Sequence, residues 1–136
     1  MIVIDTNVLS ELWKVEPDSN VLAWIDAQAI ETPYLSAITV VELRYSLATM
    51  PEGKRRTIYQ ERLEDEVLPN FAGRVLAFDL GTSKTYGELM ARARAEGKTV
   101  AKADGYITAT AATHGTVAAT RDTSSFKAGG LEVIDP

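Results

Sequence analysis

Short continuous runs of apolar residues alternate along this chain with longer stretches in which apolar residues recur every three or four positions. Ile2, Val3 and Ile4 form the first run, which is typical of a strand buried on both faces. Four more strands are predicted over 32–36, 75–78, 116–120 and 131–134. The pattern therefore predicts five short strands.

The stretches between these runs have the spacing of amphipathic helices. Helix-starting residues follow the first strand at 5–7 and recur at 17–19. The first helix is expected to present one apolar face, made by Val8, Leu9, Leu12 and Trp13. Further helices are predicted over 39–50, 54–68, 82–95 and 103–114. Strands separated mostly by helices indicate an α/β fold in which a five-stranded parallel sheet carries helices on both faces.

Length and composition narrow the class of protein. The 136 residues leave room for one domain, at 1–136, and the apolar share of 46% is that of a globular chain. The absence of cysteine excludes disulfides, cysteine-bound metals and thiol nucleophiles. Without a leader-like start or an apolar run of about 18 residues, we expect a soluble cytoplasmic protein with no membrane contact. Because the net charge is −5, any contact with nucleic acid must be local.

Four carboxylates are predicted to meet at one edge of the sheet. In open α/β sheets, ligands collect beyond the carboxyl ends of the strands, near the point where the strand order reverses. Asp5 directly follows the first strand, and Glu42 lies in the first turn of the helix after the second. Asp104 opens the helix before the fourth strand, and Asp122 follows that strand.

Each of these acids also has a purely structural interpretation. Asp5 suits a helix N-cap, and Glu42 could complete a capping box with Thr39. Asp104 could complement a helix dipole, and Asp122 could begin a turn. The cluster is more informative than its members, because four neighbouring carboxylates repel one another unless a cation lies between them.

The chemistry of the four oxygen ligands indicates a hard divalent ion. With no cysteine and a single histidine in the chain, the donor set favours Mg²⁺, or Mn²⁺, over softer metals. Mg²⁺ commonly keeps several waters, so some of the acids should act through water. A phosphodiester is the matching substrate class, with metal-activated water as the nucleophile of an in-line displacement.

Three motifs resemble those of the PIN-domain ribonucleases, in order and across nearly the whole chain. They are IVIDTNVLSEL at 2–12, SAITVVELRY at 36–45 and ADGYITATA at 103–111, the last continuing through HG at 114–115 to AATRDTSSF at 118–126. The nearest subgroup is the VapC/FitB-type toxin. The resemblance implies a PIN-like three-layer fold and a Mg²⁺-dependent endoribonuclease, the toxin of a type II toxin–antitoxin system. It also implies inhibition by a cognate antitoxin, operator DNA contact only through that antitoxin, and a homodimer.

The resemblance places Asp5, Glu42, Asp104 and Asp122 at the family's acidic positions, as catalytic residues and metal ligands. It further suggests that the Thr6 and Thr120 hydroxyls support the site, although ordinary turn hydrogen bonding explains them equally well.

One position departs from the family pattern. Where many relatives carry another acid, this chain has Ser125 before Phe126. A serine hydroxyl can hold a metal-bound water but adds no charge, which leaves a further acidic contribution in doubt.

Basic residues near the motifs are candidates for binding the RNA backbone. Lys102 and Arg121 are the two that we select, and solvated charges or salt bridges are the alternative. Asp79 also follows a strand run, but no family motif surrounds it, and we interpret it as a helix cap.

Two other functions are alternatives to the nuclease. A non-catalytic PIN-like subunit that binds a partner repressor and DNA would be expected to have lost at least one of the four acids. A receiver-like phosphoacceptor would need paired acids after the first strand, where this chain has Asp5 alone.

Overall fold

Five parallel strands form the middle layer of the computed structural model, which describes residues 1–136. The strands are β1 (Ile2–Ile4), β2 (Pro33–Ser36), β3 (Val75–Leu76), β4 (Val117–Ala119) and β5 (Val133–Ile134). Their order in the sheet is β3-β2-β1-β4-β5. The predicted five-stranded parallel sheet is therefore confirmed.

The central position of β1 creates the switch point of the sheet. β1 pairs with β2 on one side and with β4 on the other, so that Ile2 lies opposite both Pro33 and Val117. After β1 the chain builds outward to β3, and it then returns to the other side of β1 to place β4 and β5. The carboxyl ends of β1 and β4 thus flank the crevice where open α/β sheets bind ligands.

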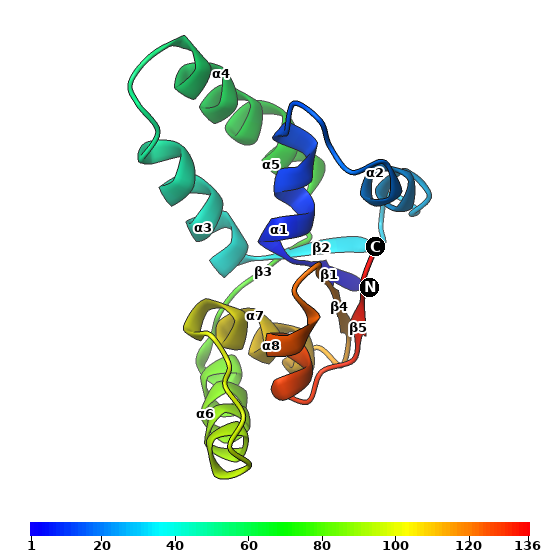
Figure 1. Ribbon diagram of the computed structural model, residues 1–136, viewed down its shortest axis with the longest axis vertical. Helices are drawn as coiled ribbons and strands as arrows, with labels where there is room; N and C mark the ends of the chain where they lie inside the picture. The colour runs from blue at the N-terminus through cyan, green and yellow to red at the C-terminus, as the bar shows by residue number, and fades with distance from the viewer.

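Helices cover both faces of the sheet (Figure 1). One layer holds α1 (Thr6–Leu9), the 3₁₀ helix η1 (Ser10–Trp13), α2 (Ser19–Asp26), α3 (Ala37–Ala48), α4 (Lys54–Arg62), the π-helical turn η2 (Leu63–Val67) and α5 (Leu68–Asn70). The opposite layer holds α6 (Leu80–Ala95), α7 (Lys102–Thr113) and α8 (Thr123–Ala128). No helix is long and apolar enough to cross a membrane.

Successive residues of β1 anchor two separate apolar cores. Val3 packs with Ile107 and Phe126 on the α7 side of the sheet, whereas Ile4 packs with Val8 and other residues of the α1–α5 layer. Both β1 side chains are almost completely buried. This two-sided burial explains the continuous apolar run in the sequence, since successive strand residues point to opposite faces.

A glycine allows α7, which carries Asp104, to pack closely on α6. A Cβ atom at Gly105 would lie 2.9 Å from the Met90 sulfur and 3.1 Å from the Tyr86 ring. Close packing at this point fixes the start of α7 against the neighbouring helix.

Helix starts differ from the predictions at one important place. The helix after β2 begins at Ala37, not Thr39, because the Ser36 hydroxyl accepts a hydrogen bond from the Ile38 N–H at 3.1 Å and forms the N-cap. Thr39 is therefore inside the helix and fully buried. The Thr39–Glu42 capping box, the structural alternative for Glu42, is absent, and Glu42 lies in the second turn of the helix and not in the first as predicted.

Two further expectations are corrected. The first helix tightens into a 3₁₀ turn at Ser10, which rotates Leu12 away from the apolar face and leaves it 39% exposed. The third strand pairs over Val75 and Leu76 alone, because Phe78 turns to pack edge-on against the Tyr106 ring, 5.2 Å away.

Candidate functional site

Asp5 lies at the switch point and uses both carboxylate oxygens. Oδ1 accepts a hydrogen bond from the Thr6 N–H at 2.8 Å, and Oδ2 accepts one from the Thr120 hydroxyl at 2.9 Å. Asp5 is therefore the N-cap of α1, as its structural interpretation required, and also faces β4. Burial, followed by the charges of Asp104 and Glu42, raises the pKa of Asp5 from 3.8 to about 6.

The Thr6 hydroxyl joins α1 to α3. It donates a hydrogen bond to Glu42 Oε1 at 2.7 Å. Glu42 is half-buried and close enough to Asp5 for its charge to raise the pKa of that carboxyl. Thr6 thus holds the second acid of the cluster beside the first.

Asp104 lies in the first turn of α7, half-buried and facing Ser125. Burial and the charge of Asp122 raise the pKa of Asp104, and a hydrogen bond from the Ser125 hydroxyl lowers it. The same hydroxyl accepts the Ala101 N–H at 3.1 Å, which supplies the side-chain cap that α7 otherwise lacks. Ser125, 8% exposed, therefore fastens α8 to the start of α7.

Asp122 is the most exposed of the four acids. It occupies the N-cap position of α8, yet its carboxylate accepts no backbone N–H and receives only the Ser124 hydroxyl, at 3.1 Å. The Asp122 N–H donates to the Thr120 hydroxyl oxygen at 3.1 Å. Because Thr120 also donates to Asp5, it links the turns that follow β1 and β4.

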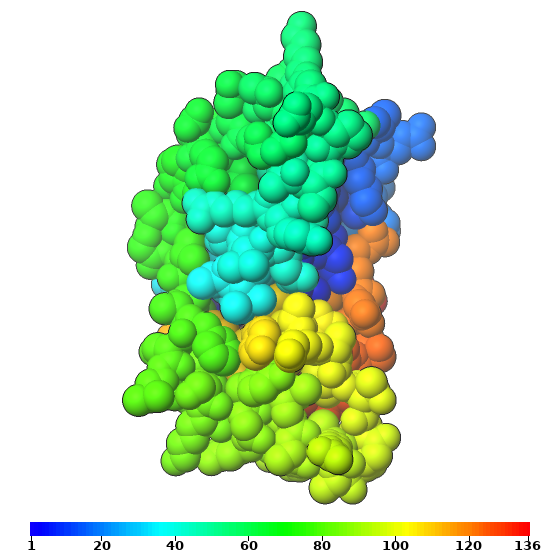
Figure 2. All heavy atoms as spheres, turned by 90° about the vertical axis from the view of Figure 1, so that its left-hand side faces the viewer, coloured from blue at the N-terminus to red at the C-terminus, as the bar shows by residue number.

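The four carboxylates come from four parts of the chain and influence one another in pairs: the charges of Asp104 and Glu42 raise the pKa of Asp5, and that of Asp122 raises the pKa of Asp104. Figure 2 shows the blue, teal, yellow and orange segments that carry them meeting near the middle of one face. None of the chain's five ion pairs involves any of the four. Their negative charge is thus uncompensated by the protein, which is the condition that favours a bound cation.

The donor set fits a hard ion that keeps part of its water shell. It consists of carboxylate and hydroxyl oxygens, the ligands that Mg²⁺ and Mn²⁺ prefer. No three of the chain's His, Asp or Glu side chains are gathered into a ready-made metal cage. Mg²⁺ usually takes one or two carboxylates and retains several waters, so its binding does not require such a cage.

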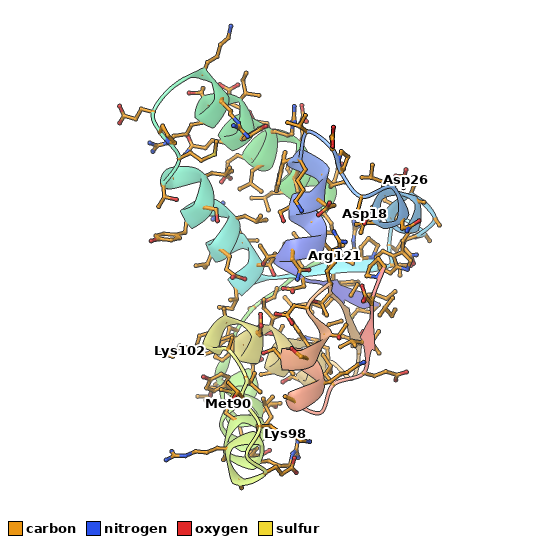
Figure 3. All side chains as sticks on the ribbon, in the orientation of Figure 1. Asp18, Asp26, Met90, Lys98, Lys102 and Arg121 are labelled. Atoms are coloured by element: carbon orange, nitrogen blue, oxygen red, sulfur yellow. The ribbon has the colours of Figure 1, made fainter.

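The two candidate RNA-binding residues have different surroundings (Figure 3). Lys102 is exposed at the start of α7 and belongs to no ion pair. The Arg121 guanidinium contacts Glu11 at 3.2 Å and Asp18 at 3.1 Å. Arg121 is therefore held in salt bridges, with acids other than the neighbouring Asp122.

Sequence reasoning missed two residues that border the site. Asn7 accepts the Arg121 N–H at its Oδ1 atom, at 3.1 Å, and donates from Nδ2 to the Thr120 hydroxyl at 3.3 Å. Glu11 is only 2% exposed. Its position in an apolar stretch was the one available signal, because a charged residue on a buried face needs a partner.

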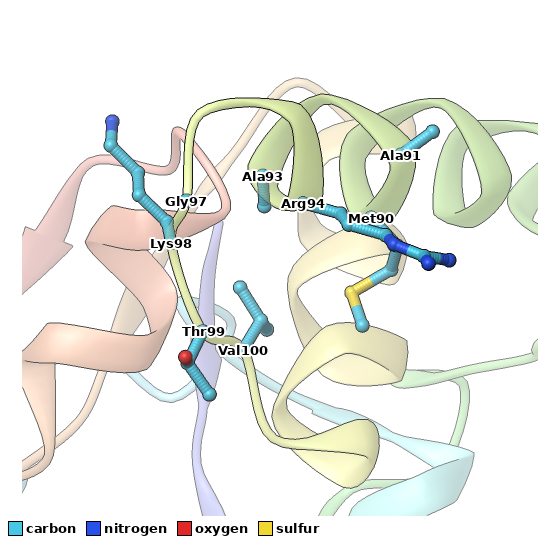
Figure 4. A pocket seen from close by; sticks show the side chains of 8 residues that line it. All are labelled: Met90, Ala91, Ala93, Arg94, Gly97, Lys98, Thr99 and Val100. Atoms are coloured by element: carbon cyan, nitrogen blue, oxygen red, sulfur yellow. The ribbon is translucent and has the colours of Figure 1, made fainter.

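A hollow of about 540 Å³ lies away from the carboxylates, between the end of α6 and the start of α7 (Figure 4). Its basic residues do not converge, since Lys98 points out of the hollow and pairs with Glu96 at 3.0 Å. The hollow therefore adds nothing to the candidate site. Asp79 also stands apart, as the predicted cap of α6, accepting the Thr82 N–H at 2.9 Å.

Comparison with known proteins identifies the family. Residues 2–130 match the PIN domain. The chain is 68% identical to VapC ribonuclease Y4jK of Sinorhizobium fredii, over 100% of this chain and 97% of that protein. It is 47% identical to toxin FitB of Neisseria gonorrhoeae, over 100% and 98%.

A solved structure has the same fold. The structure of FitAB bound to an IR36 DNA fragment superposes with a TM-score of 0.95 at 46% identity, over 98% of this chain and 94% of that one. The resemblance that the three motifs carry extends to the whole chain. The protein therefore belongs to the PIN-domain family, in the group that includes VapC and FitB.

Proposed function

We propose that this protein is a metal-dependent endoribonuclease that hydrolyses RNA phosphodiesters and serves as the toxin of a type II toxin–antitoxin system in the cytoplasm. The observation that carries the proposal is the cluster of Asp5, Glu42, Asp104 and Asp122 without a positive partner. The relative most informative about activity is named a VapC ribonuclease.

The four carboxylates would hold the ion, some of them through water. Bound Mg²⁺, or Mn²⁺, would supply Lewis-acid stabilisation of phosphate charge and lower the pKa of water. Thr6 fixes Glu42, and Thr120 fixes Asp5, so both hydroxyls keep the carboxylates in place before the ion arrives. Lys102, two residues before Asp104 in the first turn of α7, would bind RNA phosphate.

RNA cleavage by the purified, antitoxin-free protein tests this proposal. We expect a labelled single-stranded RNA to be cut with Mg²⁺ and not with EDTA. Asp104→Asn should abolish cutting. Asp79→Asn is the matched control, because Asp79 also lies beyond a strand end but only caps α6, and it should cut like the wild type.

Failure to cut RNA would be informative. If the folded protein cuts no RNA with Mg²⁺ or Mn²⁺ and still binds an antitoxin that contacts operator DNA, the alternative of a non-catalytic partner of a repressor is correct.

We propose that a cognate antitoxin docks in a groove of about 350 Å³ beside the acids. The groove lies between the α1–η1 segment and the α3–α4 hairpin, and Thr6 at one end contacts Glu42. Trp13, Leu47 and Met50 line it and suit apolar anchors of a peptide. Operator DNA would then be contacted through the antitoxin, as the FitAB complex with DNA suggests.

A second copy of this chain is the partner we propose for an exposed apolar face of α3 and β3. Val41 is 60% exposed and Tyr45 is 71% exposed. Val41 and the edge-strand residue Val75 line one shallow hollow, and Figure 2 shows α3 beside the green segment that contains β3. Burial of such residues against the same face of another copy would give a twofold homodimer.

A further inference from the structure

Arg121 is held at three points by residues of the first 18 positions. Its guanidinium contacts the Glu11 carboxylate through Nη1, at 3.2 Å, and the Asp18 carboxylate through Nη2, at 3.1 Å. Its backbone N–H donates to Asn7 Oδ1 at 3.1 Å. We refer to Asn7, Glu11 and Asp18 together with Arg121 as the Arg121 clamp.

Glu11 is the buried centre of the clamp. Its side chain is 3% exposed, and its charge has positive neighbours, although the Oε2 atom accepts no hydrogen bond. One oxygen accepts the Asp18 N–H at 2.9 Å, and the other faces Lys14 at 2.8 Å as well as Arg121. A buried carboxylate needs positive partners to keep its charge, so Glu11 holds Arg121 and Lys14 against it.

The clamp adjoins the residues that place two of the four acids. Arg121 stands between Thr120, which donates to Asp5, and Asp122. Asn7 reaches Thr120 as well, donating from Nδ2 at 3.3 Å. Fixing Arg121 therefore fixes the turn after β4 against the turn after β1, at the switch point of the sheet.

We propose that Glu11 and Arg121 are positioning residues, which hold the 120–122 turn so that Asp122 stays beside Asp104 and Thr120 stays on Asp5. This inference rests on the proposed metal-dependent function of the four acids. The positioning role replaces the RNA-binding role expected for Arg121, because the Arg121 guanidinium is already engaged by two carboxylates. The role resembles that of outer partners in metal sites, whose loss weakens metal affinity about 10- to 100-fold.

Glu11→Gln tests the proposal, because it removes the charge that holds Arg121 and keeps the shape of the side chain. The matched control is Glu64→Gln, which breaks the exposed Arg44–Glu64 pair, at 2.8 Å, and shares no residue with the clamp. Three readouts are compared: the affinity for Mn²⁺ measured by electron paramagnetic resonance, amide hydrogen exchange over 119–123, and kcat and KM for RNA.

The clamp predicts a specific set of changes. In Glu11→Gln, Mn²⁺ binding weakens about 10-fold, exchange over 119–123 accelerates, and kcat falls while KM for RNA stays within twofold. Arg121→Lys keeps the positive charge but loses the two guanidinium nitrogens that contact Glu11 and Asp18, and it gives the same changes. The double variant is no worse than either single one, since both break the same contact. Glu64→Gln behaves as the wild type.

Other results would overturn the inference. Unchanged Mn²⁺ affinity and exchange in Glu11→Gln would show that the clamp does not position the turn. If Arg121→Met raises KM for RNA while Glu11→Gln leaves kcat and KM unchanged, Arg121 contacts RNA directly. If the wild type binds no Mn²⁺ and cuts no RNA, the proposed function fails, and the exchange measurement alone still decides whether the clamp orders the turn.

Discussion

Replacement of Asp5 by asparagine should abolish RNA cleavage and, in the absence of divalent ions, stabilise the protein. Asp5 is 4% exposed, and its pKa is raised from 3.8 to about 6. One pKa unit corresponds to about 1.36 kcal/mol, so holding this carboxylate charged at pH 7 costs about 3 kcal/mol. Asparagine has no charge, can still accept the Thr6 N–H and can donate to the Thr120 oxygen.

The pH dependence follows from the direction of the pKa change. A carboxyl group whose pKa is higher in the folded state takes up a proton more readily when folded, so its burial penalty is absent below pH 3.8 and complete above about pH 6. Asp5→Asn should therefore exceed the wild type in free energy of unfolding by about 3 kcal/mol at pH 7. The two proteins should converge near pH 4.

Urea unfolding in EDTA, followed by the fluorescence of Trp13 and Trp24, measures this difference at pH 4, 5, 6 and 7. Asp79→Asn is a control of opposite sign. Hydrogen bonds from the Thr82 N–H and hydroxyl lower the pKa of Asp79, so its contribution to stability is present above pH 3.8 and lost as the pH falls. Asp79→Asn should be destabilised at pH 7 and approach the wild type in acid.

Two outcomes would show that ionisation of Asp5 does not destabilise the folded protein. A loss of stability in Asp5→Asn at pH 7 would mean that the N-cap role of the carboxylate outweighs its charge penalty. A gain that is the same at every pH would mean that the penalty does not come from ionisation. In saturating Mg²⁺, by contrast, we expect the wild type to have the higher free energy of unfolding. The ion stabilises the wild type by mass action and leaves Asp5→Asn almost unchanged.

Three further predictions concern metal affinity, RNA binding and assembly. Ser125→Asp, which adds a charge beside Asp104, should lower stability in EDTA by about 1 kcal/mol and tighten Mn²⁺ binding, as titration calorimetry can measure. Lys102→Ala should raise KM for RNA and reduce the slope of log KM against log salt by about 1, with kcat unchanged. The wild type should sediment as a dimer at tens of micromolar, a range typical of modest dimer affinities, and Val41→Glu with Tyr45→Glu should sediment as a folded monomer.

The sequence predicted those features whose cause is local. The apolar run at Ile2 to Ile4 marks a strand buried on both faces, and the alternation of strands and helices fixes a parallel sheet. The position of Asp5 beyond the first strand then follows from the general location of sites in such sheets. The cap at Asp79 could also be predicted, because an acid before a helix accepts a free N–H of the first turn.

The sequence could not predict features that depend on contacts between distant segments. Ser36 and Thr39 both suit an N-cap, and only the end of β2 decides in favour of Ser36. Arg121 looks like a surface charge until β1 and β4 pair, which brings Asp18 and Arg121 together across 103 positions. The 3₁₀ turn that exposes Leu12 likewise depends on packing that no local pattern encodes.

Titration of the metal-free protein with Mn²⁺, with bound ion and RNA cleavage measured in the same samples, tests whether these carboxylates form a catalytic metal site. The account predicts that cleavage is absent without the ion and rises over the same Mn²⁺ concentrations as binding. In Glu42→Gln both curves should shift together to higher concentration, by about 10-fold or more. Full cleavage in samples with no bound ion, or Mn²⁺ binding that Glu42→Gln leaves unchanged, would contradict the assignment of these carboxylates to a catalytic metal site.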